Sequence, residues 1–148
     1  MFDAVYDRFK RMLVEAANEL KVGTGDSDDY GPVINEDQMK GMLGSVERAQ
    51  AAGAKILTGG KRLTGEPYGG GFFVAPTIIE HAGANDEISQ TELFGPITIL
   101  YRVKGFDEAI AMANDSPFGL TASIHTQNIN RAMTFIGQIQ AGVAVVNG

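Results

Sequence analysis

Apolar residues recur every three or four positions along the first twenty residues of the chain, and charged residues fill the positions between them. This spacing places the apolar side chains on one face and predicts an amphipathic helix over residues 2–20. We expect Gly23 and Gly25 to end this helix, because glycine adopts the left-handed conformation of a helix C-cap without steric strain. The apolar stripe consists of Phe2, Val5, Tyr6, Phe9, Met12, Leu13, Ala16, Ala17 and Leu20.

A second helix is predicted to begin directly after Asn35. The Asn35 side chain can accept a hydrogen bond from the backbone amide three residues further on, and Gln38 stands at the position that a capping box requires. The helix ends at Gly53, and its buried side comprises Met39, Met42, Leu43, Val46 and Ala49.

Short apolar runs alternate with helical patterns along the rest of the chain. Strands separated by helices indicate right-handed crossovers and a largely parallel sheet. We therefore predict an α/β protein, a single three-layer unit over residues 1–148 with a largely parallel sheet. The expected strands cover residues 55–58, 72–79, 97–103, 121–126 and 143–146, and the expected helices between the last three cover 106–113 and 128–140.

Composition narrows the classes of function. The 148 residues are 44% hydrophobic and 20% charged, which suits one globular domain. The net charge of 12 − 18 = −6 argues against a nucleic-acid partner, because phosphates are held mainly by Lys and Arg. No apolar run approaches the about 18–20 residues that span a bilayer, and no secretory leader opens the chain. We therefore expect no membrane partner and a cytoplasmic location.

The chain contains no cysteine, which excludes disulfides, thiolate metal sites and a cysteine nucleophile from these residues. Asp26 and Asp28 match the first and third positions of a calcium-binding loop, but Tyr30 occupies the fifth and breaks the pattern. His81 and His125 have no metal-type partner at short spacing. The sequence therefore predicts no metal site and no catalytic residue.

One segment, Glu92-Leu93-Phe94-Gly95-Pro96, combines a carboxylate with an aromatic ring directly before a predicted strand. In an extended chain alternate residues point the same way, so Glu92 and Phe94 are expected to share a face. A carboxylate accepts hydrogen bonds from two hydroxyls, and a ring can cover a flat apolar ligand surface. The alternative from the residues alone is a surface glutamate beside a core phenylalanine.

This segment resembles the Glu-x-Phe-Gly-Pro motif of the NAD(P)-dependent aldehyde dehydrogenases. The sequences of Thr91–Ile97 and of residues 114–120 are similar to those of the branch of the family that oxidises ketoglutarate semialdehyde. The resemblance covers the whole chain in the family's order, through Val5-Tyr6-Asp7, Leu20-Lys21-Val22-Gly23, Gly31-Pro32-Val33-Ile34-Asn35, Gly71-Phe72-Phe73, Asn114-Asp115-Ser116-Pro117-Phe118-Gly119-Leu120 and Ala141-Gly142-Val143.

The resemblance implies a reaction, a cofactor and residue roles. Members of the family oxidise an aldehyde to a carboxylic acid through a thiohemiacetal and pass a hydride to NAD or NADP. By this resemblance Glu92 binds the hydroxyls of the nicotinamide ribose and Phe94 lies against the nicotinamide. Gln38 corresponds to a residue near the adenosine ribose. These three residues are the predicted cofactor-binding residues.

The family is much longer than this chain, and its cysteine nucleophile, its nucleotide-binding domain and its oligomerisation strand fall outside the resemblance. We therefore expect residues 1–148 to form a partial catalytic domain that is inactive alone and binds NAD or NADP at most weakly. The alternative is a stand-alone binding or assembly module that keeps the catalytic-domain core without chemistry. In either case we expect a homo-oligomer, formed through an exposed sheet edge, the first helix, or both.

Overall fold

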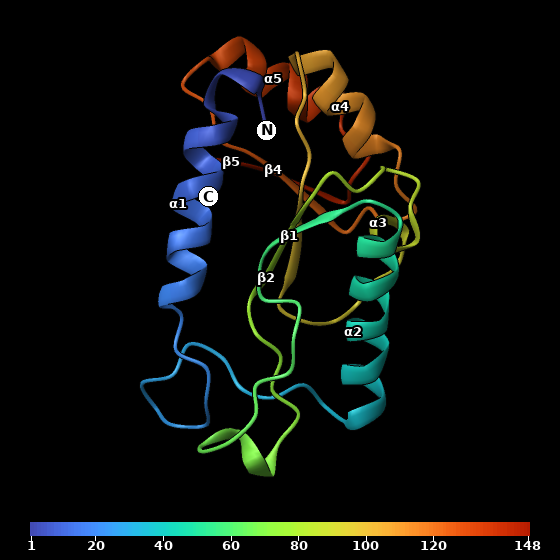
Figure 1. Cartoon of the computed structure of the whole chain (residues 1–148). Helices are drawn as coiled ribbons and strands as arrows, with labels where there is room; N and C mark the ends of the chain where they lie inside the picture. The colour runs from blue at the N-terminus through green and yellow to red at the C-terminus, as the bar shows by residue number, and fades with distance from the viewer. The chain divides into compact units, whose positions relative to one another are not determined.

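The computed structural model describes all residues from Met1 to Gly148 and divides them into two compact units (Figure 1). Unit 1 combines Met1–Asp3 with Val103–Gly148, and unit 2 comprises Ala4–Arg102. The predicted α/β class is confirmed, because helices alternate with strands and both sheets contain parallel pairs. The sequence pattern predicted one unit with one sheet, whereas the structure has two sheets in two units.

The sheet of unit 2 has the strand order β1-β2-β3, formed by β1 (Lys55–Thr58), β2 (Thr77–Glu80) and β3 (Ile97–Leu100). β2 pairs in parallel with β3, but β1 pairs with β2 in the antiparallel sense. The connection between β1 and β2 carries only the 3-10 turn η1 (Tyr68–Gly70). An antiparallel pair needs no helical crossover, which explains this departure from the predicted parallel order.

Helices cover both faces of this sheet. On one face, α1 (Asp3–Glu19) buries Tyr6 and Ala17 against Ile78 and Leu100. The other face packs against α2 (Glu36–Ala51) and the short α3 (Glu87–Gln90), with the fully buried Ile79 in the cluster. Figure 1 shows α1 and α2 on opposite sides of β1 and β2. Unit 2 therefore has the three layers that the sequence predicted for the chain.

The start of α2 confirms one prediction and corrects another. The Asn35 side-chain oxygen accepts a hydrogen bond from the Gln38 backbone amide at 2.8 Å, so Asn35 is the predicted N-cap. The Gln38 side chain does not return to the cap as a capping box requires. Its Nε2 atom donates instead to the Leu93 carbonyl at 2.5 Å. Because that carbonyl lies in the loop before β3, this hydrogen bond ties the loop to the first turn of α2.

Unit 1 contains α4 (Phe106–Asn114), β4 (Thr121–Ile124), α5 (Ile129–Gln138) and β5 (Val143–Val146). β4 and β5 pair in parallel over all four residues, and α5 provides the connection between them. Asn128 caps α5, since its side chain accepts from the Arg131 backbone amide at 3.1 Å. These elements confirm the predicted strand–helix–strand order, with β4 two residues shorter than expected.

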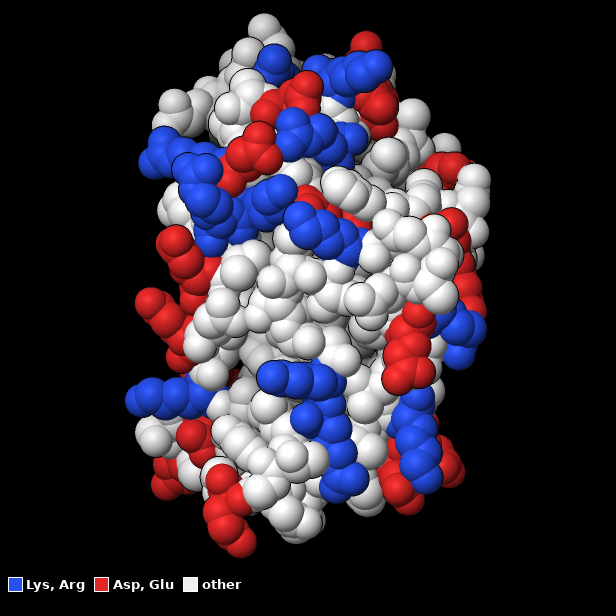
Figure 2. Space-filling view, in the orientation of Figure 1, with Lys and Arg blue, Asp and Glu red and all other residues white.

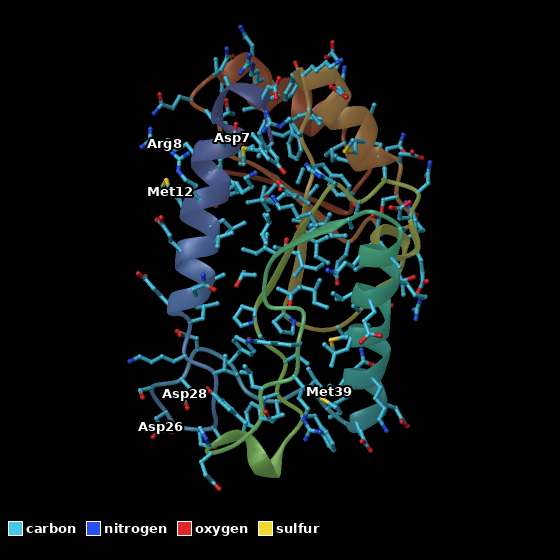
Figure 3. The ribbon with its side chains drawn as sticks, in the orientation of Figure 1. Asp7, Arg8, Met12, Asp26, Asp28 and Met39 are labelled. Carbon is cyan, nitrogen blue, oxygen red and sulfur yellow. The ribbon has the colours of Figure 1, made fainter.

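No helix combines the length and the apolar character that crossing a membrane requires. In Figure 2, acidic and basic side chains alternate over the helices. The surface between α1 and α2 is mostly uncharged. Figure 3 places Met12 on the side of α1 away from the sheet, and Met39 on the side of α2 that faces it.

Candidate cofactor site

The structure brings the three predicted site residues to one place. Glu92 and Phe94 lie in the loop of residues 91–96 that joins α3 to β3, and Gln38 lies in the first turn of α2. The hydrogen bond from Gln38 to the Leu93 carbonyl connects the two elements. Gln38 is thus placed to hold the backbone between Glu92 and Phe94, a role that the resemblance alone did not imply.

Glu92 and Phe94 line the same pocket, which has a volume of about 260 Å³. Both side chains are exposed, and Phe94 keeps 75% of its surface accessible. The Glu92 carboxylate forms no hydrogen bond or ion pair with another residue of the chain. Its oxygens are therefore available to hydroxyl donors of a ligand. The remaining lining residues are Ile88, Thr91, Leu93, Gly95, Ile97 and Ile99.

The backbone at Phe94 has a φ of 48°, in the left-handed region. The alternation argument from the sequence assumed an extended chain, so its reason for placing Glu92 and Phe94 together is wrong, although both residues line one pocket. A non-glycine residue in this region carries about 1–3 kcal/mol of strain and occurs often at functional sites. Sequence periodicity gives no signal for such a dihedral angle.

Neighbouring contacts hold the strained loop in place. A Cβ atom built on Gly95 would overlap Sδ of Met42, a fully buried residue of α2. The Thr77 amide of β2 donates to the Pro96 carbonyl at 2.8 Å, and the Ile97 amide donates to the Gly95 carbonyl at 2.8 Å. Glycine is required here for close approach to α2, so the loop is positioned by both α2 and the sheet.

A cluster of polar side chains surrounds Glu80 at the end of β2. Sequence reasoning did not predict this cluster. Glu80 is only 1% exposed and accepts hydrogen bonds from Lys10 Nζ at 2.9 Å and from the Tyr6 hydroxyl at 3.2 Å. Lys55 Nζ lies 3.3 Å from the other carboxylate oxygen. The only sign of this cluster in the sequence was a glutamate directly after the β-branched run Thr77-Ile78-Ile79.

The charges of this cluster explain its titration. Burial alone would raise the pKa of Glu80, but hydrogen bonds from Lys10, Lys55 and Tyr6 outweigh it and hold the pKa below its ordinary value. Burial, followed by the hydrogen bond to Glu80, raises the pKa of Tyr6 to about 12. Glu80 is therefore a charged residue that holds α1 to the sheet, and it does not line the Glu92 pocket.

The groups at the Glu92 pocket are suited to bind a ligand. The pocket offers a free carboxylate and an exposed ring, while the chain has no cysteine and no group of residues suited to hold a metal ion. A carboxylate beside a ring can bind a diol next to a flat ring system. A ribose joined to an aromatic base has this combination.

Comparison with known proteins gives the family. The sequence profile of the aldehyde dehydrogenase family matches residues 2–148. The alpha-ketoglutaric semialdehyde dehydrogenase of Bacillus subtilis is 36% identical over 97% of this chain and 30% of its own length. The alpha-ketoglutarate semialdehyde dehydrogenase of Haloferax volcanii is 38% identical, with the same two shares covered.

Solved structures agree. The betaine aldehyde dehydrogenase of Staphylococcus aureus, crystallised in complex with NAD+, superposes with a TM-score of 0.94 at 28% identity, over 98% of this chain and 29% of that one. Aldehyde dehydrogenase 21 of Physcomitrella patens, in complex with the reaction product succinate, gives a TM-score of 0.91 at 32% identity, over 99% and 29%. The chain spans about 30% of the length of the curated relatives it matches. With a family match over nearly its full length, this chain belongs to the aldehyde dehydrogenase family.

Proposed function

We propose that the chain supplies the nicotinamide-ribose part of the cofactor site of an NAD(P)-dependent aldehyde dehydrogenase, which oxidises aldehydes to carboxylic acids. The observation that carries the proposal is the shared pocket of Glu92 and Phe94, with Gln38 hydrogen-bonded to the backbone between them. The NAD+ complex of the Staphylococcus aureus relative supports the choice of cofactor.

The residues present fit this part of the cofactor. The Glu92 carboxylate has no protein partner and can accept two ribose hydroxyls, and the exposed Phe94 ring can lie against a flat base. When bound, the nicotinamide supplies the hydride acceptor of the oxidation. The contribution of this chain is to bind and orient the ribose and to shield one side of the base.

The pocket is small for a whole dinucleotide. Its volume of about 260 Å³ lies below the roughly 300–1,000 Å³ of sites that enclose a complete ligand. By the family resemblance, the pyrophosphate is held by the nucleotide-binding domain, outside these residues. The few contacts available here hardly offset the association entropy, so we expect a dissociation constant for NAD of about 1 mM or weaker.

Titration of the 15N-labelled chain with NAD up to 20 mM tests the cofactor contact. Amide shifts are expected at residues 91–95, and the Glu92→Gln and Phe94→Ala variants should each weaken the apparent affinity at least threefold. Glu19→Gln, a change of the same kind at an exposed position of α1, is the control. Shifts confined to other regions, or equal shifts in all four proteins, would overturn the proposed contact.

The proposed aldehyde is one that carries a carboxylate, as α-ketoglutarate semialdehyde does. Both curated relatives bear that substrate in their names. The product succinate in the Physcomitrella patens structure is a dicarboxylate, so the aldehyde from which it forms also carries a carboxylate. A chimera tests the reaction, in which residues 2–148 replace the matched segment of the Bacillus subtilis relative. Oxidation of α-ketoglutarate semialdehyde, with a KM for NAD raised by Glu92→Gln, is the expected result. A folded chimera without activity would contradict it.

The second candidate is a stand-alone binding or assembly module. The observation that favours it is the absence of a cysteine together with exposed apolar side chains on α1, where Met12 is 55% accessible. A module of this kind would bind a protein partner but give no amide shifts with NAD at residues 91–95, so the same titration separates the two candidates. The cytoplasmic location expected from the sequence stays part of the proposal.

A further inference from the structure

The last two turns of α2 hold the short helix α3, which directly precedes the loop of residues 91–96 (Figure 1). Arg48 on α2 binds both oxygens of the Glu87 carboxylate, since its Nε atom donates to Oε2 at 2.8 Å and its Nη2 atom donates to Oε1. The Ser45 hydroxyl donates to the same Oε1 atom at 3.2 Å. Both oxygens of the first side chain of α3 are therefore bound by donors from α2.

This contact fixes an orientation as well as a distance. A planar guanidinium that donates two parallel hydrogen bonds sets the direction of a carboxylate, which the ammonium group of a lysine does not do. Arg48 Nη2 also donates to Ser45 Oγ at 3.0 Å, and Ser45 is only 4% exposed. Hydrogen bonds from Arg48 hold the pKa of Glu87 below its ordinary value, so the carboxylate is charged at neutral pH.

α3 depends on such contacts for its place. It has only four residues, and a helix of this length is not stable by itself. Ile88 is buried in the same apolar cluster as Val46 of α2, and Ser89 Oγ donates to the Gly83 carbonyl at 2.6 Å. Glu87 adds the polar contact with α2. The direction in which the chain leaves α3 is therefore set by α2 and by the neighbouring backbone.

Glu92 lies between two contacts that its neighbours make with α2. The pair of Glu87 and Arg48 comes before it in the chain, and the hydrogen bond from Gln38 to the Leu93 carbonyl comes directly after it. The Glu92 carboxylate itself has no partner in the chain. Its position at the pocket is therefore determined by the backbone on either side.

We propose that Glu87 and Arg48 form a positioning pair, which sets the place of Glu92 at its pocket without touching the ligand. Neither residue of the pair lines that pocket. The ligand, the ribose of NAD or NADP, is taken from the proposed function, on which this role rests. Both side chains of the pair are more than half exposed, so the pair adds little to the stability of the whole fold. Its effect is local, because it limits the orientations of α3 and of the loop that follows.

Backbone order in the free chain tests the pair without a ligand. From 15N relaxation, we expect order parameters of about 0.85 at residues 91–95, falling toward about 0.6 in both Glu87→Gln and Arg48→Lys. Arg48→Lys keeps the positive charge but loses the bidentate geometry. Lys40→Gln, which removes the exposed ion pair with Glu36 on the same helix, is the control and should leave the order unchanged. Unchanged order in both variants of the pair would overturn the proposal.

Titration with NAD separates position from charge. If the pair positions Glu92, Glu87→Gln should weaken the apparent affinity about threefold. A direct effect of the Glu87 charge predicts the opposite sign, because NAD carries a negatively charged pyrophosphate that the loss of a carboxylate would favour. The exchanged pair, Glu87→Arg with Arg48→Glu, restores the ion pair at unchanged net charge and should recover most of the order and of the affinity. Tighter binding by Glu87→Gln, or a folded exchanged pair that recovers neither, would overturn the proposal.

The positioning role and the cofactor contact can fail separately. If NAD causes no amide shifts at residues 91–95 of the native chain, the cofactor contact fails, while the order parameters still decide whether the pair holds the loop. If the native chain binds NAD there and Glu87→Gln has the same loop order and the same affinity, the positioning role is overturned and the contact at Glu92 stands.

Discussion

Single residues decide how firmly α1 is held to the sheet. Glu80 is buried between Tyr6, Lys10 and Lys55, and removing a hydrogen-bonded buried charge costs about 1.5–3 kcal/mol. We expect Glu80→Gln to lower the free energy of unfolding by this amount at pH 7, measured by urea denaturation followed by far-UV circular dichroism. Glu87→Gln, which removes the exposed ion pair with Arg48, is the control and should change stability little.

Glu80 also makes the free energy of unfolding depend on pH. The pKa of Glu80 is lowered in the folded chain, so its stabilisation is complete above the ordinary value of 4.5 and is lost as the pH falls through the lower folded value. The stability difference between the native chain and Glu80→Gln should therefore be constant from about pH 7 to 5.5 and shrink below 4.5. A difference that grows on acidification would show that the carboxylate is not stabilised by its lysines.

Gly95 controls the placement of the loop of residues 91–96. An added Cβ would overlap Met42, and forced overpacking costs about 1–3 kcal/mol. Gly95→Ala should lower the midpoint of thermal unfolding and reduce the NAD-induced shifts at residues 91–95. Gly41→Ala, beside Met42 on the exposed side of α2, meets no atom within 4 Å and should be neutral or stabilising. Equal effects of the two substitutions would mean that space around Gly95 is unimportant.

Residue types were predictable where a motif fixes them. Glu92 and Phe94 were predicted as cofactor-binding residues through the resemblance, because the Glu-x-Phe-Gly-Pro motif is specific. The structure places both at one pocket, and their role in binding a cofactor stays a prediction. The left-handed backbone at Phe94 and the turn of the Gln38 side chain toward Leu93 were not predictable. Both depend on contacts between segments far apart in the sequence, which periodicity does not describe.

At the scale of elements, the cap of α2 offers a direct test. Asn35 accepts from the Gln38 amide, and replacing such a cap by alanine costs about 0.5–2 kcal/mol. Asn35→Ala should lower stability by this amount and increase hydrogen exchange in the first turn of α2. Because Gln38 lies in that turn, NAD-induced shifts in the 91–95 loop should fall as well. Asn128→Ala, which uncaps α5 in unit 1, is the control and should leave those shifts unchanged.

Long periodic elements were predicted best from the sequence. The stripe over residues 2–20 corresponds to α1, which ends at Glu19, and the helices and strands of unit 1 appear in the expected order. The predicted left-handed C-cap is wrong, because neither Gly23 nor Gly25 has a positive φ. The four-residue α3 was missed because it is too short to show a period. Strand β1 was predicted with its observed bounds, but its antiparallel direction was not, because strand direction is set by the connection to β2 rather than by the residues of the strand.

For the whole molecule, we expect no oxidation of aldehydes by this chain alone. The covalent step of the family needs an activated thiolate, and the chain contains no cysteine. Production of NADH or NADPH from a panel of aldehydes should equal the rate without protein, measured by absorbance at neutral pH. Turnover above that background, abolished by a substitution within residues 1–148, would contradict this expectation.

The division into two units was not predictable from local patterns. Each strand pair satisfies its own hydrogen bonds, and the sequence contains no linker-like segment at Val103, where the units meet in the chain. The strands divide into a β1-β2-β3 sheet and a β4-β5 sheet. This division depends on contacts between residues far apart in the sequence. A single sheet would need another strand beside β3, and unit 2 contains no such strand.

We expect the hydrogen bond between Gln38 and Leu93 to limit how the gene of this chain can be recombined with those of its relatives. Its two partners are encoded 55 codons apart, so a crossover between them joins the start of α2 from one parent to the loop of residues 91–96 from another. Shuffled libraries should therefore keep functional chimeras mainly when both segments descend from the same parent, or when each parent carries an amide donor at position 38. Sequencing the survivors would reveal this linkage as a shortage of crossovers within the interval.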